Sequence, residues 1–139
     1  MKSKQVKNVV FVRLERGEEI ISQLEIVVKK YGIKLAKISG IGACDQVYLG
    51  IYNADRNGYI KKTFNGKFEV TSLIGNISEM NSEPYFHLHI TLGDENMQVI
   101  GGHLYSGRII ATAEIIIEIY EGQIERFFDE ETGLNLWQI

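Results

Sequence analysis

The most constraining feature of this sequence is a stretch in which apolar and polar residues alternate strictly. From Phe86 to Leu92 apolar side chains occupy every second position, and His87, His89 and Thr91 fill the positions between them. A period of two is that of a β-strand with one buried face. The pattern therefore predicts a strand on which His87 and His89 point in the same direction.

A second extended segment follows this strand after a turn. Residues 93–96 are typical turn sequence and an extended pattern resumes after them, so the two segments are predicted to form an antiparallel hairpin. With the turn centred on Glu95, His87 lies across from His103. Directly opposed side chains have Cβ atoms about 5 Å apart, so one hairpin gathers all three histidines of the chain.

Three imidazoles gathered in this way predict a metal site. Imidazole suits zinc, copper, iron and nickel, and three protein ligands with an open fourth position are typical of catalytic zinc. We therefore predict that His87, His89 and His103 bind a divalent ion, with zinc as the first choice, and that binding weakens below about pH 6. The alternative is ordinary surface or hydrogen-bonded histidines, because a one-residue slip in register would turn His103 to the opposite face. Gly101 and Gly102 either leave room for a ligand beside His89 or mark a bulge.

The other segments predict an α+β fold in which a curled, mainly antiparallel β-sheet packs against one long helix. The helix is predicted between Gly17 and Gly32, where acidic residues begin it and apolar residues recur with helical spacing. Turn-type residues at 65–66 and 105–107 are expected to separate neighbouring strands. The strands themselves are predicted over residues 7–15, 33–39, 46–52, 59–64, 67–78, 109–120, 123–128 and 134–139.

Length and charge restrict the class of protein. A chain of 139 residues without a linker is expected to form one domain over residues 1–139. The formal charge of -3 provides no basic surface for nucleic acid, so direct DNA binding is not expected. No apolar run is long enough for a membrane span or a signal peptide, which makes the cytoplasm the expected compartment. Cys44, the one cysteine, is predicted to be buried and unreactive.

Four charged residues are the candidates for further roles at the metal site. Glu114 interrupts an apolar strand segment, and the alternation of its strand allows Glu69 to lie on an inner face. Both are predicted as general acid or base groups. Arg13 and Arg108 are predicted to hold a substrate carboxylate through a bidentate fork. The alternative for all four is an exposed charge or a structural ion pair.

The chain resembles the plants-and-prokaryotes conserved domain family over nearly its whole length. The resemblance implies a compact α/β subunit that assembles into a homotrimer, and in prokaryotic members a histidine-rich metal site, here on His87, His89 and His103. The plant members carry a basic Arg-Gly-Arg-Pro hook, which this chain does not have. The matching motifs are Val12-Arg13-Leu14 with Gly17-Glu18-Glu19, Ser39 to Ala43, Gly66 to Asn76, His87-Leu88-His89, Gly101-Gly102-His103-Leu104 and Ala113-Glu114-Ile115.

The histidine pattern is also similar to the zinc site of acetolactate decarboxylase, whose fold this family is thought to share distantly. The likeness consists of His-x-His and one later histidine, so it supports the metal assignment more than any reaction. Two functions are therefore expected. One is a metal-dependent enzyme, a lyase or hydrolase, that acts on a small oxygen-rich substrate. The other is a trimeric regulatory module that associates with DNA or binds a protein partner, as the plant relatives do.

Overall fold

The computed structural model describes all residues from Met1 to Ile139. It contains one α-helix and a six-stranded antiparallel sheet in the order β1-β2-β6-β3-β4-β5, and β5 also pairs with β6, so that part of the sheet closes on itself. The elements are β1 (Lys2–Val6), β2 (Val9–Glu15), α1 (Ile20–Tyr31), β3 (Ala36–Asn53), the 3₁₀ turn η1 (Ala54–Arg56), β4 (Gly58–Met80), β5 (Glu83–Gly93), β6 (Val99–Ile119), β7 (Arg126–Asp129) and β8 (Leu134–Trp137). The predicted curled antiparallel sheet with one helix is confirmed. With a single helix against eight strands, however, the fold is mainly β rather than α+β.

Helix α1 is shorter than the predicted segment because Glu19 caps it. The Glu19 carboxylate accepts hydrogen bonds from the backbone N–H groups of Ile21 and Ser22, which satisfies donors that the first turn leaves free. Gly32 ends the helix in the left-handed conformation, with φ of 63°. The apolar side of the helix packs against one face of the sheet through Ile20, Leu24, Val27 and Val28. No helix has both the length and the apolar character that crossing a membrane requires.

The strands are longer than the sequence pattern predicts, and two predicted turns are wrong. Asn65 lies inside β4, paired with Gln46 of β3, and residues 105–107 lie inside β6. Shifts in the β3 register, one of them between Cys44 and Gln46, take up the irregular positions without ending a strand. The N-terminal strand β1, absent from our expectation, adds to the sheet edge along β2.

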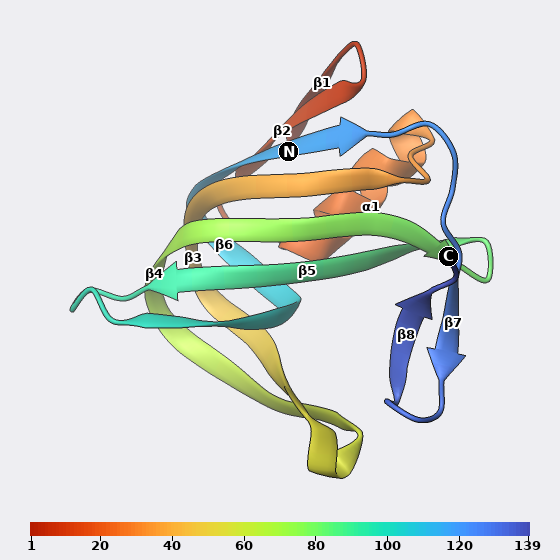
Figure 1. Cartoon of the computed structure of the whole chain (residues 1–139). Helices are drawn as coiled ribbons and strands as arrows, with labels where there is room; N and C mark the ends of the chain where they lie inside the picture. The colour runs from red at the N-terminus through yellow and green to blue at the C-terminus, as the bar shows by residue number, and fades with distance from the viewer.

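The two faces of the sheet are covered by other elements to different extents. Helix α1 lies behind one face in Figure 1, and the β7–β8 hairpin (blue) stands beside one end of the sheet. On the face away from the helix much of the apolar surface is open, since Phe11, Ile74 and Ile116 are all exposed. One row of side chains crosses this outer face from β1 to β5 and consists of Lys4, Phe11, Ile116, Ser39, Ile74 and His89.

Candidate metal centre

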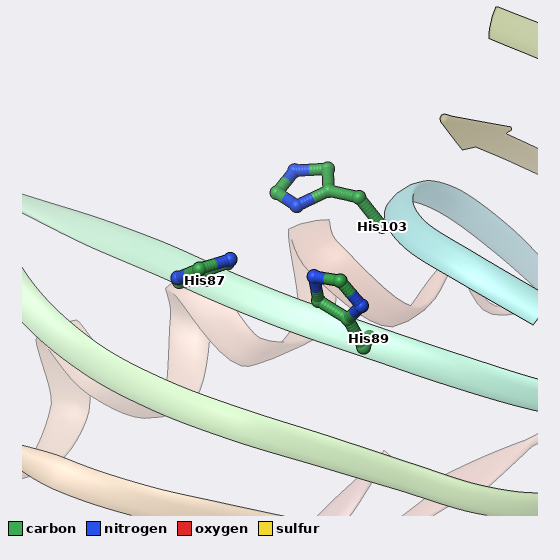
Figure 2. Close-up of side chains that lie close together, drawn as sticks. All are labelled: His87, His89 and His103. Carbon is green, nitrogen blue, oxygen red and sulfur yellow. The ribbon is translucent and has the colours of Figure 1, made fainter. Parts of the chain in front are cut away.

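The three histidines lie together, as the strand pattern predicts. His87 and His89 project from the same side of β5, and His103 reaches toward them from β6 (Figure 2). The ring centroids are 5.3 Å apart for His87 and His89, 5.4 Å for His87 and His103, and 5.6 Å for His89 and His103. One ligand nitrogen from each ring lies within 4.8 Å of the others. The cluster thus offers three imidazole donors to one point.

The pairing that brings them together differs from the predicted one. His89, not His87, lies directly opposite His103. The turn is centred one residue later than expected, and the Asp94 carboxylate shapes it by accepting hydrogen bonds from the backbone N–H groups of Asn96 and Gln98. Centring the turn one residue later moves the pairing by two residues, and an even shift keeps every side chain on its face. The histidines therefore still converge although the predicted register is wrong.

The two glycines before His103 serve the close approach of neighbouring backbones. A Cβ on Gly101 would lie 2.7 Å from the carbonyl oxygen of Ile90, and a Cβ on Gly102 would lie 2.7 Å from that of Gly50. Both atoms are backbone and cannot move aside easily. Gly50 itself pairs with His103. Of the two roles left open by the sequence, strand packing around the histidines is the one that these contacts support.

Burial favours the neutral form of two members of the cluster, His103 and His87. His103 is 8% exposed, and burial first, then the neighbouring His87, His89 and Lys61, lowers its pKa to about 4. Burial, followed by the charges of Arg126 and His89, also lowers the pKa of His87. Neutral imidazole is the form that binds metal. The Nδ1 atom of His103 is buried without a hydrogen-bond partner, which fits a site where a metal ion takes up a ring nitrogen.

His87 and His103 border a cavity of about 600 Å³, here called the histidine pocket. Its lining contains no aspartate or glutamate. The rings of Tyr59 and Tyr105 pack on His103 at centroid distances of 5.1 and 4.8 Å. Burial is the main cause that raises the pKa of both tyrosines, so their hydroxyls stay protonated at neutral pH. The pocket is lined by Tyr59, Asn76, Tyr85, His87, His103, Tyr105, Arg126, Gly133, Leu134, Asn135, Leu136 and Trp137.

None of the four charged residues predicted from the sequence lines the histidine pocket. Arg13 and Glu114 lie opposite each other on β2 and β6 and border a second, larger cavity. Arg108 forms a bidentate ion pair with Asp45, with both N···O distances 2.8 Å, so its guanidinium fork already has a carboxylate partner. Glu69 is exposed and pairs with Gly93 at the far end of β5. The structure brings the histidines to one another, but not these four residues to the histidines.

The second cavity, here called the open groove, has a volume of about 800 Å³ and lies on the uncovered outer face. Its floor contains the exposed apolar residues Phe11, Ile41, Ile74 and Ile116. Lys2 and Lys4 border it together with Arg13 and Glu114, and it contains no histidine or cysteine. The groove therefore has charge and apolar surface without soft metal ligands.

Sequence reasoning missed the residues on the far wall of the histidine pocket. Arg126, Asn135 and Trp137 belong to the β7–β8 hairpin, which the sequence predicts as a hairpin but does not place. The useful signal is an arginine within a short apolar strand, where a charged side chain needs partners. That signal identifies a buried cation, but not which strand it meets.

Cys44 is buried, as predicted from the sequence. Burial is the main cause that raises the pKa of its thiol to about 12, with Asp45 and Glu69 adding to the effect. A thiol with such a pKa stays protonated and is a poor nucleophile. Cys44 therefore belongs to the core.

Comparison with known proteins connects this geometry to a family. The model of the Plants and Prokaryotes Conserved (PCC) domain matches residues 1–121. A candidate DNA-binding protein from Bacteroides thetaiotaomicron has 34% sequence identity and a TM-score of 0.95, over 99% of this chain and 96% of that one. A metal-containing protein from Archaeoglobus fulgidus has 36% identity and a TM-score of 0.88, over 97% and 96% of the two chains. No curated protein sequence matches.

A more distant likeness concerns the fold alone. A Staphylococcus aureus protein of unknown function, described as similar to alpha-acetolactate decarboxylase, has a TM-score of 0.56 with 12% identity. The match covers 87% of this chain and 54% of that one. At such low identity the shared curled sheet carries no information about substrate.

Proposed function

Because the chain belongs to the Plants and Prokaryotes Conserved domain family and its three histidines converge, we propose that it binds a divalent metal ion through His87, His89 and His103. The observation that carries this proposal is the convergence of three imidazole nitrogens within 4.8 Å, one of them on a buried ring. The description of the Archaeoglobus fulgidus relative as metal-containing supports it. Zinc is the first choice because neutral imidazoles suit it.

We propose further that the bound ion serves a lyase or hydrolase reaction on a small, oxygen-rich molecule. Three protein ligands leave a coordination position open, and the ion would supply Lewis acidity toward a substrate oxygen or water there. The histidine pocket has a volume in the range of small-molecule sites. Its walls include the aromatic rings of Tyr59, Tyr85, Tyr105 and Trp137.

Two tyrosines that carry a phenolic proton pack on the histidine cluster. Tyr59 and Tyr105 pack directly on His103, and their raised pKa keeps the phenolic proton available for donation to a substrate oxygen. We therefore propose them as hydrogen-bond or proton donors. Acid-base roles for Glu69 and Glu114, and carboxylate binding by Arg13 and Arg108, stay predictions from the sequence, and each needs a route to the pocket that the present arrangement does not provide.

Metal analysis of protein purified without an affinity tag tests the proposal. We expect about one zinc ion per chain after dialysis against zinc, and a cobalt-substituted protein whose visible absorption shows four- or five-coordinate metal. The tag is omitted because additional histidines would bind metal themselves. Protein that retains no zinc, cobalt, iron or nickel after dialysis would contradict the proposal.

We also propose that the protein forms a homotrimer. The support is the exposed apolar strip of Phe11, Ile41, Ile74 and Ile116 in the open groove, which is unusual surface for an isolated subunit. The family resemblance adds to it. Multi-angle light scattering measures the mass directly, and a monomer at micromolar concentration would contradict the proposal.

A non-enzymatic binding module is the second candidate function. It is favoured by the description of the Bacteroides thetaiotaomicron relative as a candidate DNA-binding protein. Against it stands the charge of -3, because phosphate neutralisation by lysine and arginine supplies most non-specific DNA affinity. We expect no complex with duplex DNA at physiological salt in a fluorescence titration. A submicromolar complex that weakens with added salt would favour the binding module.

A further inference from the structure

Arg126 is a buried cation on the wall of the histidine pocket, and it has no acidic partner. Its residue is 8% exposed, and none of the ion pairs in the structure includes it. Its guanidinium carbon lies 4.6 Å from the ring centroid of Tyr85 and 5.5 Å from that of Trp137. Placing a charge between two aromatic rings removes it from water, which is costly when no opposite charge is nearby.

The hydrogen bonds of Arg126 leave part of its donor set free. Nε donates to the Ser78 hydroxyl at 2.7 Å, one terminal nitrogen donates to the Asn135 carbonyl oxygen at 2.6 Å, and the other donates to the Asn76 amide oxygen at 3.0 Å. A guanidinium group carries five N–H donors, so these three bonds leave about two without a protein acceptor. All three acceptors are neutral. The protein thus holds the fork in place without neutralising its charge.

This fork lies next to the histidines. Asn76, which accepts one of the Arg126 bonds, is the cross-strand partner of His87 in the pairing of β4 with β5. Directly opposed residues have Cβ atoms about 5 Å apart. Arg126, His87 and His103 also line the same cavity. A molecule of a few heavy atoms can therefore contact the guanidinium and the histidine cluster at once.

The charges that line the pocket favour a ligand with a negative charge. The lining provides no carboxylate, and neutral histidines do not offset the charge of a divalent ion. An anionic ligand would supply the missing negative charge to both cations, and a planar carboxylate matches the geometry of a guanidinium fork.

We infer that the histidine pocket binds a small organic acid, whose carboxylate is held by Arg126 while a second oxygen of the same molecule lies at the metal site. This inference rests on the proposed metal function and names its ligand class. It assigns to Arg126 a role in specificity that the match to residues 1–121 does not reach, because Arg126 lies beyond that region. The apolar and aromatic walls contributed by Trp137 and Tyr85 would face the body of the acid.

Arg126 also fastens the β7–β8 hairpin to β4, so the test must separate that role from ligand binding. The probe is sodium pyruvate, which has a carboxylate and a neighbouring oxo group, and the neutral control ligand is pyruvamide. Each is titrated into cobalt-loaded protein, and binding is followed by the visible cobalt spectrum and by calorimetry. Arg126→Gln removes the cation, Arg126→Lys keeps the charge but loses the fork, and Ser78→Ala removes one fastening bond while Arg126 remains.

We expect pyruvate to bind at least about tenfold more tightly than pyruvamide, and Arg126→Gln to abolish that preference. Arg126→Lys should weaken pyruvate binding by several-fold and serves in place of Arg126→Gln if the glutamine protein does not fold. Ser78→Ala should bind pyruvate within about threefold of the unaltered protein although it melts at a lower temperature.

Two kinds of result would overturn the inference in different ways. Cobalt binding with no response to pyruvate, with equal response to both ligands, or with the preference unchanged in Arg126→Gln, would overturn it and leave the proposed metal function standing. Failure of the unaltered protein to bind zinc, cobalt, iron or nickel would overturn the metal proposal and this inference with it.

Discussion

The open groove and the histidine pocket lie on the same outer side of the sheet, yet they are lined by different kinds of functional side chain. The groove is the larger, with Arg13 and Glu114 on its walls, but it contains no metal-binding side chain except the carboxylate of Glu114. The pocket is smaller and has two of the three histidines together with Arg126, but no carboxylate. Volume and the presence of acid-base residues therefore favour the open groove as a functional site. The convergence of metal donors favours the histidine pocket.

The two cavities also differ in how far their polar groups are buried. In the groove, Glu114 and Arg13 are exposed to solvent, where water screens their interactions. In the pocket, His103 and Arg126 are each only 8% exposed, so their interactions with a ligand are stronger. Polar groups that are buried without full satisfaction indicate a ligand more strongly than polar groups that water already satisfies.

The largest effect is expected for metal binding at the histidine pocket. Replacing His87, His89 or His103 by alanine should lower metal affinity by about a hundredfold or more in each case, because two imidazoles hold a divalent ion far more weakly than three. Competition with a chromophoric chelator measures the change. The matched control is Glu114→Gln in the open groove, which should retain the metal.

One outcome would reverse the assignment of the two cavities. Full metal occupancy in His103→Ala together with loss of metal in Glu114→Gln would place the site in the groove. Full occupancy in both variants would show that the cluster is a set of packed histidines.

The position of the histidines was predictable because it depends on strand parity. Alternation from Phe86 to Leu92 sets the side of His87 and His89, and parity survives the error of two residues in the predicted pairing with His103. Nothing similar was available for Arg126. Its partners Ser78 and Asn76 lie 48 and 50 residues earlier in the chain, and their contact depends on how the last hairpin docks.

The long strands were predicted in pieces for a related reason. Asn65 favours a turn locally, but its pairing with Gln46 of β3 holds it extended. Gly66 follows it inside β4, at a register shift. Tertiary pairing also determines to which face of the sheet Glu69 and Glu114 point. Alternation in the sequence shows only which neighbours share a face, and not which face a bulge exposes. Glu69 and Glu114 both lie on strands whose pairing includes register shifts, whereas β2, which carries Arg13, pairs without one.

The second prediction tests whether the open groove is the interface of the proposed trimer. Phe11→Asp places a charge on the exposed apolar floor and should convert the proposed trimer to monomers, since a buried unpaired carboxylate is costly at an interface. Light scattering measures the threefold change in mass. Ile26→Asp is the matched control, because Ile26 on α1 is 51% exposed, close to the 48% of Phe11, but lies outside the groove. A mass change with Ile26→Asp alone would move the interface to the helix.

The third prediction concerns the stability of the metal-free protein in acid. The pKa of His103 is about 4 in the folded chain because of burial, against about 6.5 when unfolded. A base with a lowered folded-state pKa stabilises the fold fully above pH 6.5, and this contribution is lost as the pH falls toward 4. We expect His103 to account for a loss of up to about 2 kcal/mol in the free energy of unfolding between pH 7 and 4.5.

Urea denaturation of metal-free protein at the two pH values measures this loss. His103→Asn removes the titrating group, so the difference in pH dependence between the two proteins isolates its contribution from that of the carboxylates. Equal pH dependence in both would show that His103 is already solvated in the metal-free state. In that case the pocket would be as wet as the groove, and the contrast in burial would fail.

The smallest expected effect belongs to Glu114, and it decides whether the two cavities act separately. Its side chain is exposed and forms no ion pair, so Glu114→Gln should shift the melting temperature by less than about 2 °C and leave metal affinity unchanged. Differential scanning calorimetry and the chelator competition measure both quantities on the same protein. If a small-molecule reaction is found, loss of turnover with metal and stability intact would confirm the sequence-based prediction of Glu114 as an acid or base. Because Glu114 does not line the histidine pocket of its own chain, such a result would require the groove of one subunit to meet the pocket of another.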